Sequence, residues 1–290
     1  MPALFAAGNF TSAGGVPANR IAKWDGSVWS PLGSGIVGGV NALEVFDDGT
    51  GPALYAAGSF TSAGGVSADR IAKWDGTSWS ALVSAQQEVL SNLQELEVHD
   101  DGSGQALYAA GLFSLGAGGF AQVAKWDGTS WSNVGAVLGV VTALSAFDDG
   151  GGASLCAGGQ FEVADLVEAH HVAEWNGAAW GALSNTSGWV HDKVLALTAH
   201  DDGGGQALFV GGSFTRVGGV DANRIAKWDG TSWSALGTGT GSDVLALVTF
   251  DDGGGPALFA GGDFLRMGGV PARFVARWNG SVWSPLGNGT

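Results

Sequence analysis

Short apolar runs separated by polar turn residues recur along the whole chain. In one repeat, four runs are bounded by Gly, Asp, Asn and Ser: VNALEVF (40–46, run a), ALYAAGSF (53–60, run b), RIAKW (70–74, run c) and SWSAL (78–82, run d). Apolar runs of this length between turn residues are typical of β-strands, and no helical period extends across any repeat. The pattern predicts an all-β protein built from four-stranded antiparallel units.

A pair of tryptophans five positions apart marks each repeat. Six pairs occur, at Trp24/Trp29, Trp74/Trp79, Trp126/Trp131, Trp175/Trp180, Trp228/Trp233 and Trp278/Trp283. A repeat of about fifty residues that holds four strands is typical of the β-propeller, in which each repeat forms one blade. We therefore predict that residues 1–290 form one six-bladed β-propeller domain, with repeats that begin near residues 3, 53, 106, 154, 207 and 257.

The connections between the runs differ in length. DDGTGP joins run a to run b, and DGTS joins run c to run d; both are short and rich in Asp and Gly, as in hairpin turns. The b-to-c link (TSAGGVSAD) and the d-to-a link (GSGIVGG) are longer, so we expect one of them to cross between sheets.

The order of these runs resembles the kelch-type blade, with an apolar inner strand, a strand that ends in Gly-Gly or Ala-Gly, and an outer tryptophan strand. The closer resemblance is to a group of uncharacterised bacterial repeat proteins whose blades read FDDGxGPALYAGGxF…IAKWDGxxWxxLGxG. This resemblance covers essentially the whole chain. It implies a propeller in which run a lines the central channel and run d forms the outer edge, and it implies no activity.

Run a occurs five times, whereas runs b, c and d occur six times. We therefore expect one blade to lack its inner strand, and expect the chain to be a segment of a longer protein or of an assembly. Another segment or another chain would then supply the missing strand.

The twelve paired tryptophans have two interpretations. Side chains alternate along a strand, so both members of a pair lie on one face of the hairpin, where the indoles can fill the wide outer gap between blades. Alternatively, the indoles form a platform on which sugars or bases stack. Recurrence in every repeat favours the structural interpretation.

The net charge of −15 is unevenly distributed along the repeat. Acidic side chains concentrate in the predicted hairpin turns, whereas arginines concentrate near the b-to-c links, at Arg20, Arg70, Arg216, Arg224, Arg266 and Arg273. We predict that the propeller is electrostatically two-faced, with the acidic turns on the hairpin face and these arginines near the opposite rim. An acidic protein of this kind is not expected to bind nucleic acid.

The Asp-Asp-Gly turns also have two interpretations. Asp favours turns because its carboxylate bonds the backbone of nearby residues, and carboxylate oxygens are also the ligands that calcium prefers. The spacing does not match an EF-hand loop, so structural turns are favoured over weak binding of a divalent cation. The residues concerned are Asp47, Asp48, Asp100, Asp101, Asp148, Asp149, Asp201, Asp202, Asp251 and Asp252.

The fourth repeat departs most from the pattern. Its b-to-c link reads EVADLVEAHH, and the d-to-a link that follows contains the thirteenth tryptophan. The two links lie on the same side of a blade, and His with carboxylates could bind a transition metal or serve as acid and base. The alternative is a diverged surface loop. The candidate residues are Glu162, Asp165, Glu168, His170, His171, Trp189 and His191.

The sequence contains no recognised catalytic motif, membrane-spanning run or signal peptide. Cys156 is the only cysteine and replaces an aromatic residue of run b, so we expect it to be buried. The function expected is a non-catalytic binding or structural module of an exported or cell-surface bacterial protein, with a protein or glycan as its ligand. The alternative is a metal-dependent lyase or hydrolase that uses the fourth-repeat residues.

Overall fold

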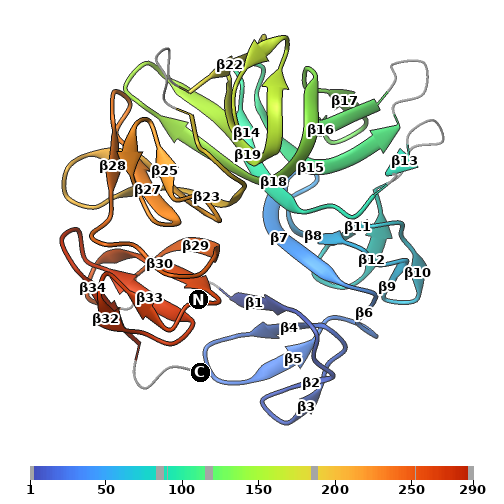
Figure 1. Cartoon of the computed structure of the whole chain (residues 1–290). Helices are drawn as coiled ribbons and strands as arrows, with labels where there is room; N and C mark the ends of the chain where they lie inside the picture. Colours follow the sequence, from blue (N-terminus) through green and yellow to red (C-terminus); the bar gives the residue numbers. More distant parts are fainter. Residues whose placement is uncertain are drawn as a thin grey trace. The chain divides into compact units, whose positions relative to one another are not determined.

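The computed structural model is all-β in the residues that it describes, which are 3–82, 88–89, 91–114, 120–183, 189–251 and 253–286. The chain divides into two compact units, Met1–Asp100 with Gly104–Val134, and Asp101–Ser103 with Gly135–Thr290. None of the described residues belongs to a helix with the length and apolar character that crossing a membrane requires. Figure 1 follows the strands in chain order from blue to red.

The first unit holds three antiparallel sheets, which match the first three repeats. The first has three strands, β1 (Leu4–Ala7), β4 (Ile21–Trp24) and β5 (Trp29–Pro31). The second has four, β7 (Val40–Asp47), β8 (Pro52–Gly58), β11 (Ile71–Trp74) and β12 (Trp79–Ala81). The third consists of β14 (Glu95–Asp100), β15 (Gln105–Ser114), β16 (Phe120–Trp126) and β17 (Trp131–Asn133), with the short β13 (Glu88–Val89) also paired to β15.

The second unit repeats this arrangement in three more sheets (Figure 1). The first consists of β18 (Val137–Asp148), β19 (Ala153–Ala164), β21 (Val172–Trp175) and β22 (Trp180–Ala182), with β20 (Val167–Glu168) also on β19. The next consists of β23 (Val194–Asp201), β24 (Gln206–Gly212), β27 (Ile225–Trp228) and β28 (Trp233–Ala235). The last consists of β29 (Val244–Asp251), β30 (Pro256–Gly262), β33 (Val275–Trp278) and β34 (Trp283–Pro285).

Small two-residue strands lie within the links, and the sequence pattern did not predict them. They form the pairs β2 (Ser12–Ala13) with β3 (Val16–Pro17), β25 (Arg216–Val217) with β26 (Val220–Asp221), and β31 (Arg266–Met267) with β32 (Val270–Pro271), and a group of three, β6 (Ile36–Val37), β9 (Ser62–Ala63) and β10 (Val66–Ser67). In the group of three, β6 belongs to a d-to-a link and β9 to the following b-to-c link. The pairing of β6 with β9 therefore connects two consecutive repeats.

The predicted strand connections are confirmed within the described residues. Run a pairs with run b, as in β7 with β8, and run c pairs with run d, as in β11 with β12. Runs b and c also pair, so the d-to-a link is the connection that crosses from one sheet to the next. Five sheets carry a run-a strand, whereas β1 pairs only with β4 among the described strands. Because the pairing is antiparallel, both hairpin turns of a sheet lie at one end (the hairpin side) and both links lie at the other (the link side).

The core consists of layers between consecutive sheets within each unit. Alanines of run b, such as Ala56 and Ala57, are fully buried and allow close approach, while large apolar side chains fill the remaining space. Cys156 is buried in such a layer, as expected from its place in run b. The core of each unit therefore consists of equivalent apolar residues from consecutive repeats.

The tryptophan pairs belong to these layers. Trp74 and Trp79 are direct cross-strand partners with ring centroids 5.4 Å apart, and the other pairs have centroids 5.2 to 5.6 Å apart. The indole Nε1 of Trp79 donates to the carbonyl of Leu32, at the end of the preceding sheet, and Trp131 donates likewise to Leu82. Each indole buries an area on the order of 200 Å². Trp79, Trp131 and Trp283 thus join their own sheet to the preceding one.

Candidate functional site

The Asp-Asp turns are held by their own hydrogen bonds. Asp47 Oδ1 accepts from the backbone amides of Gly49 and Gly51, both at 2.9 Å. The first aspartates of the other described pairs make equivalent bonds, at Asp100, Asp148, Asp201 and Asp251. The turn interpretation of these residues is therefore supported by geometry that recurs in five repeats.

The second aspartate of the pair contacts a lysine of run c. Asp48 Oδ2 lies 2.5 Å from Lys73 Nζ and 2.8 Å from the Tyr55 hydroxyl. Burial alone would raise the pKa of the Asp48 carboxyl, but the bonds from Lys73, Thr50 and Tyr55 lower that pKa below its ordinary value. Asp202 pairs with Lys227 in the same way. Because a lysine ammonium group already neutralises and occupies this carboxylate, a divalent cation is disfavoured there.

The proposed metal sites find no support in the described residues. Among the residues that the structure describes, no group of three or more His, Cys, Asp or Glu side chains lies in an arrangement that could hold a metal ion. Asp252 lies outside the described residues, and Asp101 and Asp149 bond Ser103 and Gly151 within their own turns.

The fourth-repeat cluster is partly assembled. His170 Nδ1 lies 2.7 Å from a Glu162 oxygen, and His171 Nε2 lies 3.6 Å from the other oxygen of that carboxylate. Glu168 is 3.7 Å from His170 Nε2. The ring of Trp189 packs on His170 with centroids 4.0 Å apart. Five of the seven predicted residues therefore lie together: Glu162, Glu168, His170, His171 and Trp189.

The other two candidates have different contacts. The carboxylate of Asp165 accepts from the backbone amides of Ala136 and Trp180, at 2.7 and 2.9 Å, so it holds the b-to-c link against neighbouring backbone. The backbone amide of His191 donates to the Arg216 carbonyl, and the side chain of His191 is exposed. Asp165 is thus a structural residue, and His191 contributes to the strand-like contact between links.

A small space lies beside the fourth-repeat cluster. The space beside His170 and Trp189 measures about 10 Å³, which is the size of one water molecule. Burial lowers the pKa of His171, and the charges of Glu162 and Asp192 oppose this effect. His170 and Trp189 therefore pack against each other in the gap between two sheets.

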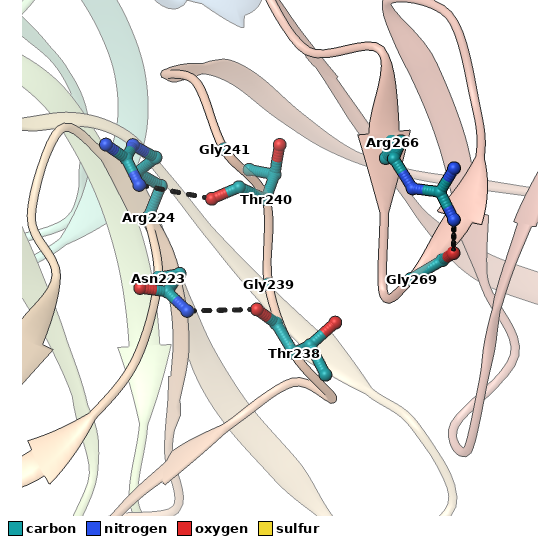
Figure 2. A pocket seen from close by; sticks show the side chains of 8 residues that line it. All are labelled: Asn223, Arg224, Thr238, Gly239, Thr240, Gly241, Arg266 and Gly269. Carbon is teal, nitrogen blue, oxygen red and sulfur yellow. Dashed lines mark hydrogen bonds between the residues drawn. The ribbon is translucent and has the colours of Figure 1, made fainter.

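A hollow of about 340 Å³ lies at the corresponding place between the last two sheets (Figure 2). Asn223 Nδ2 donates to the Thr238 carbonyl at 3.1 Å, and Arg224 donates to the Thr240 carbonyl at 3.2 Å. Arg266 donates to the Gly269 carbonyl at the far side of the hollow. The remaining lining is Gly239 and Gly241. The sequence signal for this hollow was the concentration of arginines near the links.

Three glutamates of the run-a strands were also missed. Glu44 lies on β7, and Glu95 and Glu97 lie on β14. Burial raises the pKa of Glu95 to about 7, and the charges of Glu97 and Glu44 add to this effect. The signal in the sequence was Glu at alternating positions of an otherwise apolar run.

Replacing Glu95 by Gln should stabilise the protein at alkaline pH. The Glu95 carboxyl loses its proton near pH 4.5 in the unfolded chain but only near pH 7 in the folded protein. The free energy of unfolding that this difference contributes is therefore fully present below about pH 4.5 and is lost as pH rises through about 7. Glu95→Gln should therefore add up to about 3 kcal/mol to the free energy of unfolding at pH 8, and almost nothing at pH 4. Urea denaturation at both pH values measures the difference. An equal effect at the two pH values would contradict the shifted pKa.

The comparisons with known proteins supply no relative. No protein-family model matches the chain, and no curated protein is similar to it. The resemblance to kelch-type blades therefore depends on the repeat pattern alone, and function has to be argued from the residues.

Proposed function

We propose that this chain is a non-catalytic binding module of an exported or cell-surface bacterial protein, and that it presents the link side of its sheets to a protein or a glycan. The observation that carries the proposal is that different parts of the repeat make structural contacts and line open space. Tryptophans and turn aspartates are committed to contacts between and within sheets, whereas the open hollow with hydrogen-bonding groups lies among the links.

The proposed architecture is a six-bladed, kelch-like β-propeller formed by residues 1–290. Five sheets that each contain runs a to d, two of them with one extra short strand, and one three-stranded sheet support this proposal, as do the tryptophan pairs. A strand from another segment or another chain would pair with the open edge of β1 and complete the first blade. Propellers serve many activities, so the fold by itself does not select a function.

The fourth-repeat cluster supports a structural role better than an enzymatic one. Trp189 packs on His170, and the space around the two rings would hold about one water molecule. A lyase or hydrolase would require a cleft that admits the substrate. We therefore assign these residues to packing between two sheets.

A glycan array tests the proposed function. Fluorescently labelled protein should bind a subset of glycans in a saturable manner, with equal signal in the presence and absence of EDTA. Incubation of the same glycans with the protein should leave them intact. Metal-dependent turnover that is lost in His170→Ala would show that the chain is an enzyme and would overturn the proposal.

A further inference from the structure

An asparagine and an arginine form a repeated clamp on the link side. Asn19 and Arg20 donate to the carbonyls of Ser34 and Ile36, at 3.5 and 3.4 Å. Asn223 and Arg224 make the same two contacts four repeats later, with Thr238 and Thr240. Arg20 and Arg224 share a left-handed backbone conformation, with φ of 61° and 64°. The clamp therefore fixes the links in the same way in different repeats.

The fourth repeat closes the space that this clamp leaves open in the fifth. His170 and His171 take the places of Asn223 and Arg224, and Trp189 takes the place of Gly239. The paired bridges Val190 to Val217 and Thr240 to Met267 establish this correspondence. The space beside His170 and Trp189 measures about 10 Å³, and the hollow beside Asn223 and Gly239 measures about 340 Å³. The larger hollow is the better candidate for a ligand.

The open hollow also carries positive charge. In the preceding repeat, Arg216 is the cross-strand partner of Asp221, and its Nε lies 3.8 Å from that carboxylate. Arg266 occupies the same position on β31, but its cross-strand partner is Pro271. Among the described residues, Arg266 has no carboxylate partner. Arg266 donates from Nη2 to the Gly269 carbonyl, and the other N–H groups of this exposed guanidinium remain for a ligand.

Arg224 is less available. Its Nε lies 3.9 Å from Asp243, which also accepts from the Ser213 hydroxyl at 2.9 Å. Arg224 consequently shapes the wall, and Arg266 carries the charge that a ligand would meet. Figure 2 shows the two side chains on opposite sides of the segment that contains Thr238 and Thr240.

We propose that this hollow, which lies on the link side and away from the acidic turns of the hairpin side, binds the carboxylate-bearing sugar unit of an acidic polysaccharide. Guanidinium groups recognise carboxylates through paired, charge-assisted hydrogen bonds, which suits Arg266. The hydroxyl of Thr238 and the side-chain amide of Asn223 line the hollow and are groups that bond sugar hydroxyls. Sites of a few hundred Å³ commonly hold small ligands. This inference rests on the proposed binding function and narrows its ligand to one chemical class.

Calorimetric titration with tri-galacturonate and with its methyl ester tests the proposal, because esterification removes the charge and keeps the sugar. The acid should bind at least tenfold more tightly than the ester. Arg266→Gln should weaken binding of the acid at least tenfold, and Arg216→Gln is the matched control that should leave it unchanged. Both variants should melt at the wild-type temperature, since both side chains are exposed.

Gly241→Trp provides an independent test by blocking the hollow. Gly241 lines the hollow, and a Cβ at this position meets no atom within 4 Å, so an indole should fit at the rim without a clash and obstruct entry. Binding of the acid should be lost while the melting temperature stays the same. Equal affinity for acid and ester, or unchanged affinity in both Arg266→Gln and Gly241→Trp, would overturn the inference. If other glycans or a protein still bind in that case, the proposed binding function survives without it.

Discussion

Trp131→Ala should reduce the free energy of unfolding by about 3 to 5 kcal/mol, the range typical of large truncations in a packed core. The side chain is 4% exposed, and its ring contacts Trp126 and Phe113 with centroids 5.4 and 5.2 Å away. Its Nε1 donates to Leu82 at 3.3 Å, so the substitution also leaves a buried carbonyl without this donor. Urea denaturation followed by circular dichroism measures the loss.

Trp29→Ala is the matched control for this prediction. Trp29 holds the same position in the first repeat, but it is only partly buried. Its replacement should cost clearly less than that of Trp131. If Trp131→Ala left stability within about 1 kcal/mol of wild type and abolished glycan binding instead, the tryptophans would form a ligand platform.

Gly212→Ala should destabilise the protein by about 3 kcal/mol or more, or prevent folding, because the added methyl group meets backbone that cannot move aside. A Cβ on Gly212 would lie 2.1 Å from the Lys193 carbonyl oxygen and 3.1 Å from the Val194 Cα. The register of β23 against β24 is irregular at this point, which brings the two backbones together. The same contact recurs at Gly58, Gly159 and Gly262.

Gly219→Ala controls for the loss of glycine itself. Gly219 has φ of +80°, and no atom lies within 4 Å of a Cβ placed on it. Only backbone strain opposes alanine at this position, so Gly219→Ala should lower the free energy of unfolding by about 1 kcal/mol. If denaturation curves gave the two variants equal stability, the backbone of Lys193 would not pack tightly against Gly212, contrary to this prediction.

The sequence predicted features that depend on local chemistry and on repetition. Period-two alternation placed Trp74 and Trp79 on one face, and the cross-strand pair confirms this. Asp at the turns bonds nearby amides, as its side chain commonly does. The number of run-a strands was also correct for the described residues.

Features that depend on contacts between repeats could not be predicted. The candidate Asp165 carries a carboxylate like Glu162, but a left-handed turn aims it at the backbone amide of Trp180. The hollow beside Arg266 is lined by residues of two different links, Gly239 among them, and none of these residues alone indicates a cavity. Such spaces appear only once two sheets are placed together.

Small-angle X-ray scattering tests the central claim most directly, namely that all six repeats form one closed β-propeller. A compact single domain of 290 residues should have a radius of gyration of about 19 Å. The account predicts this radius and a distance distribution with one symmetric maximum. A clearly larger radius, with the extended tail of two separate bodies or of an open array, would contradict it.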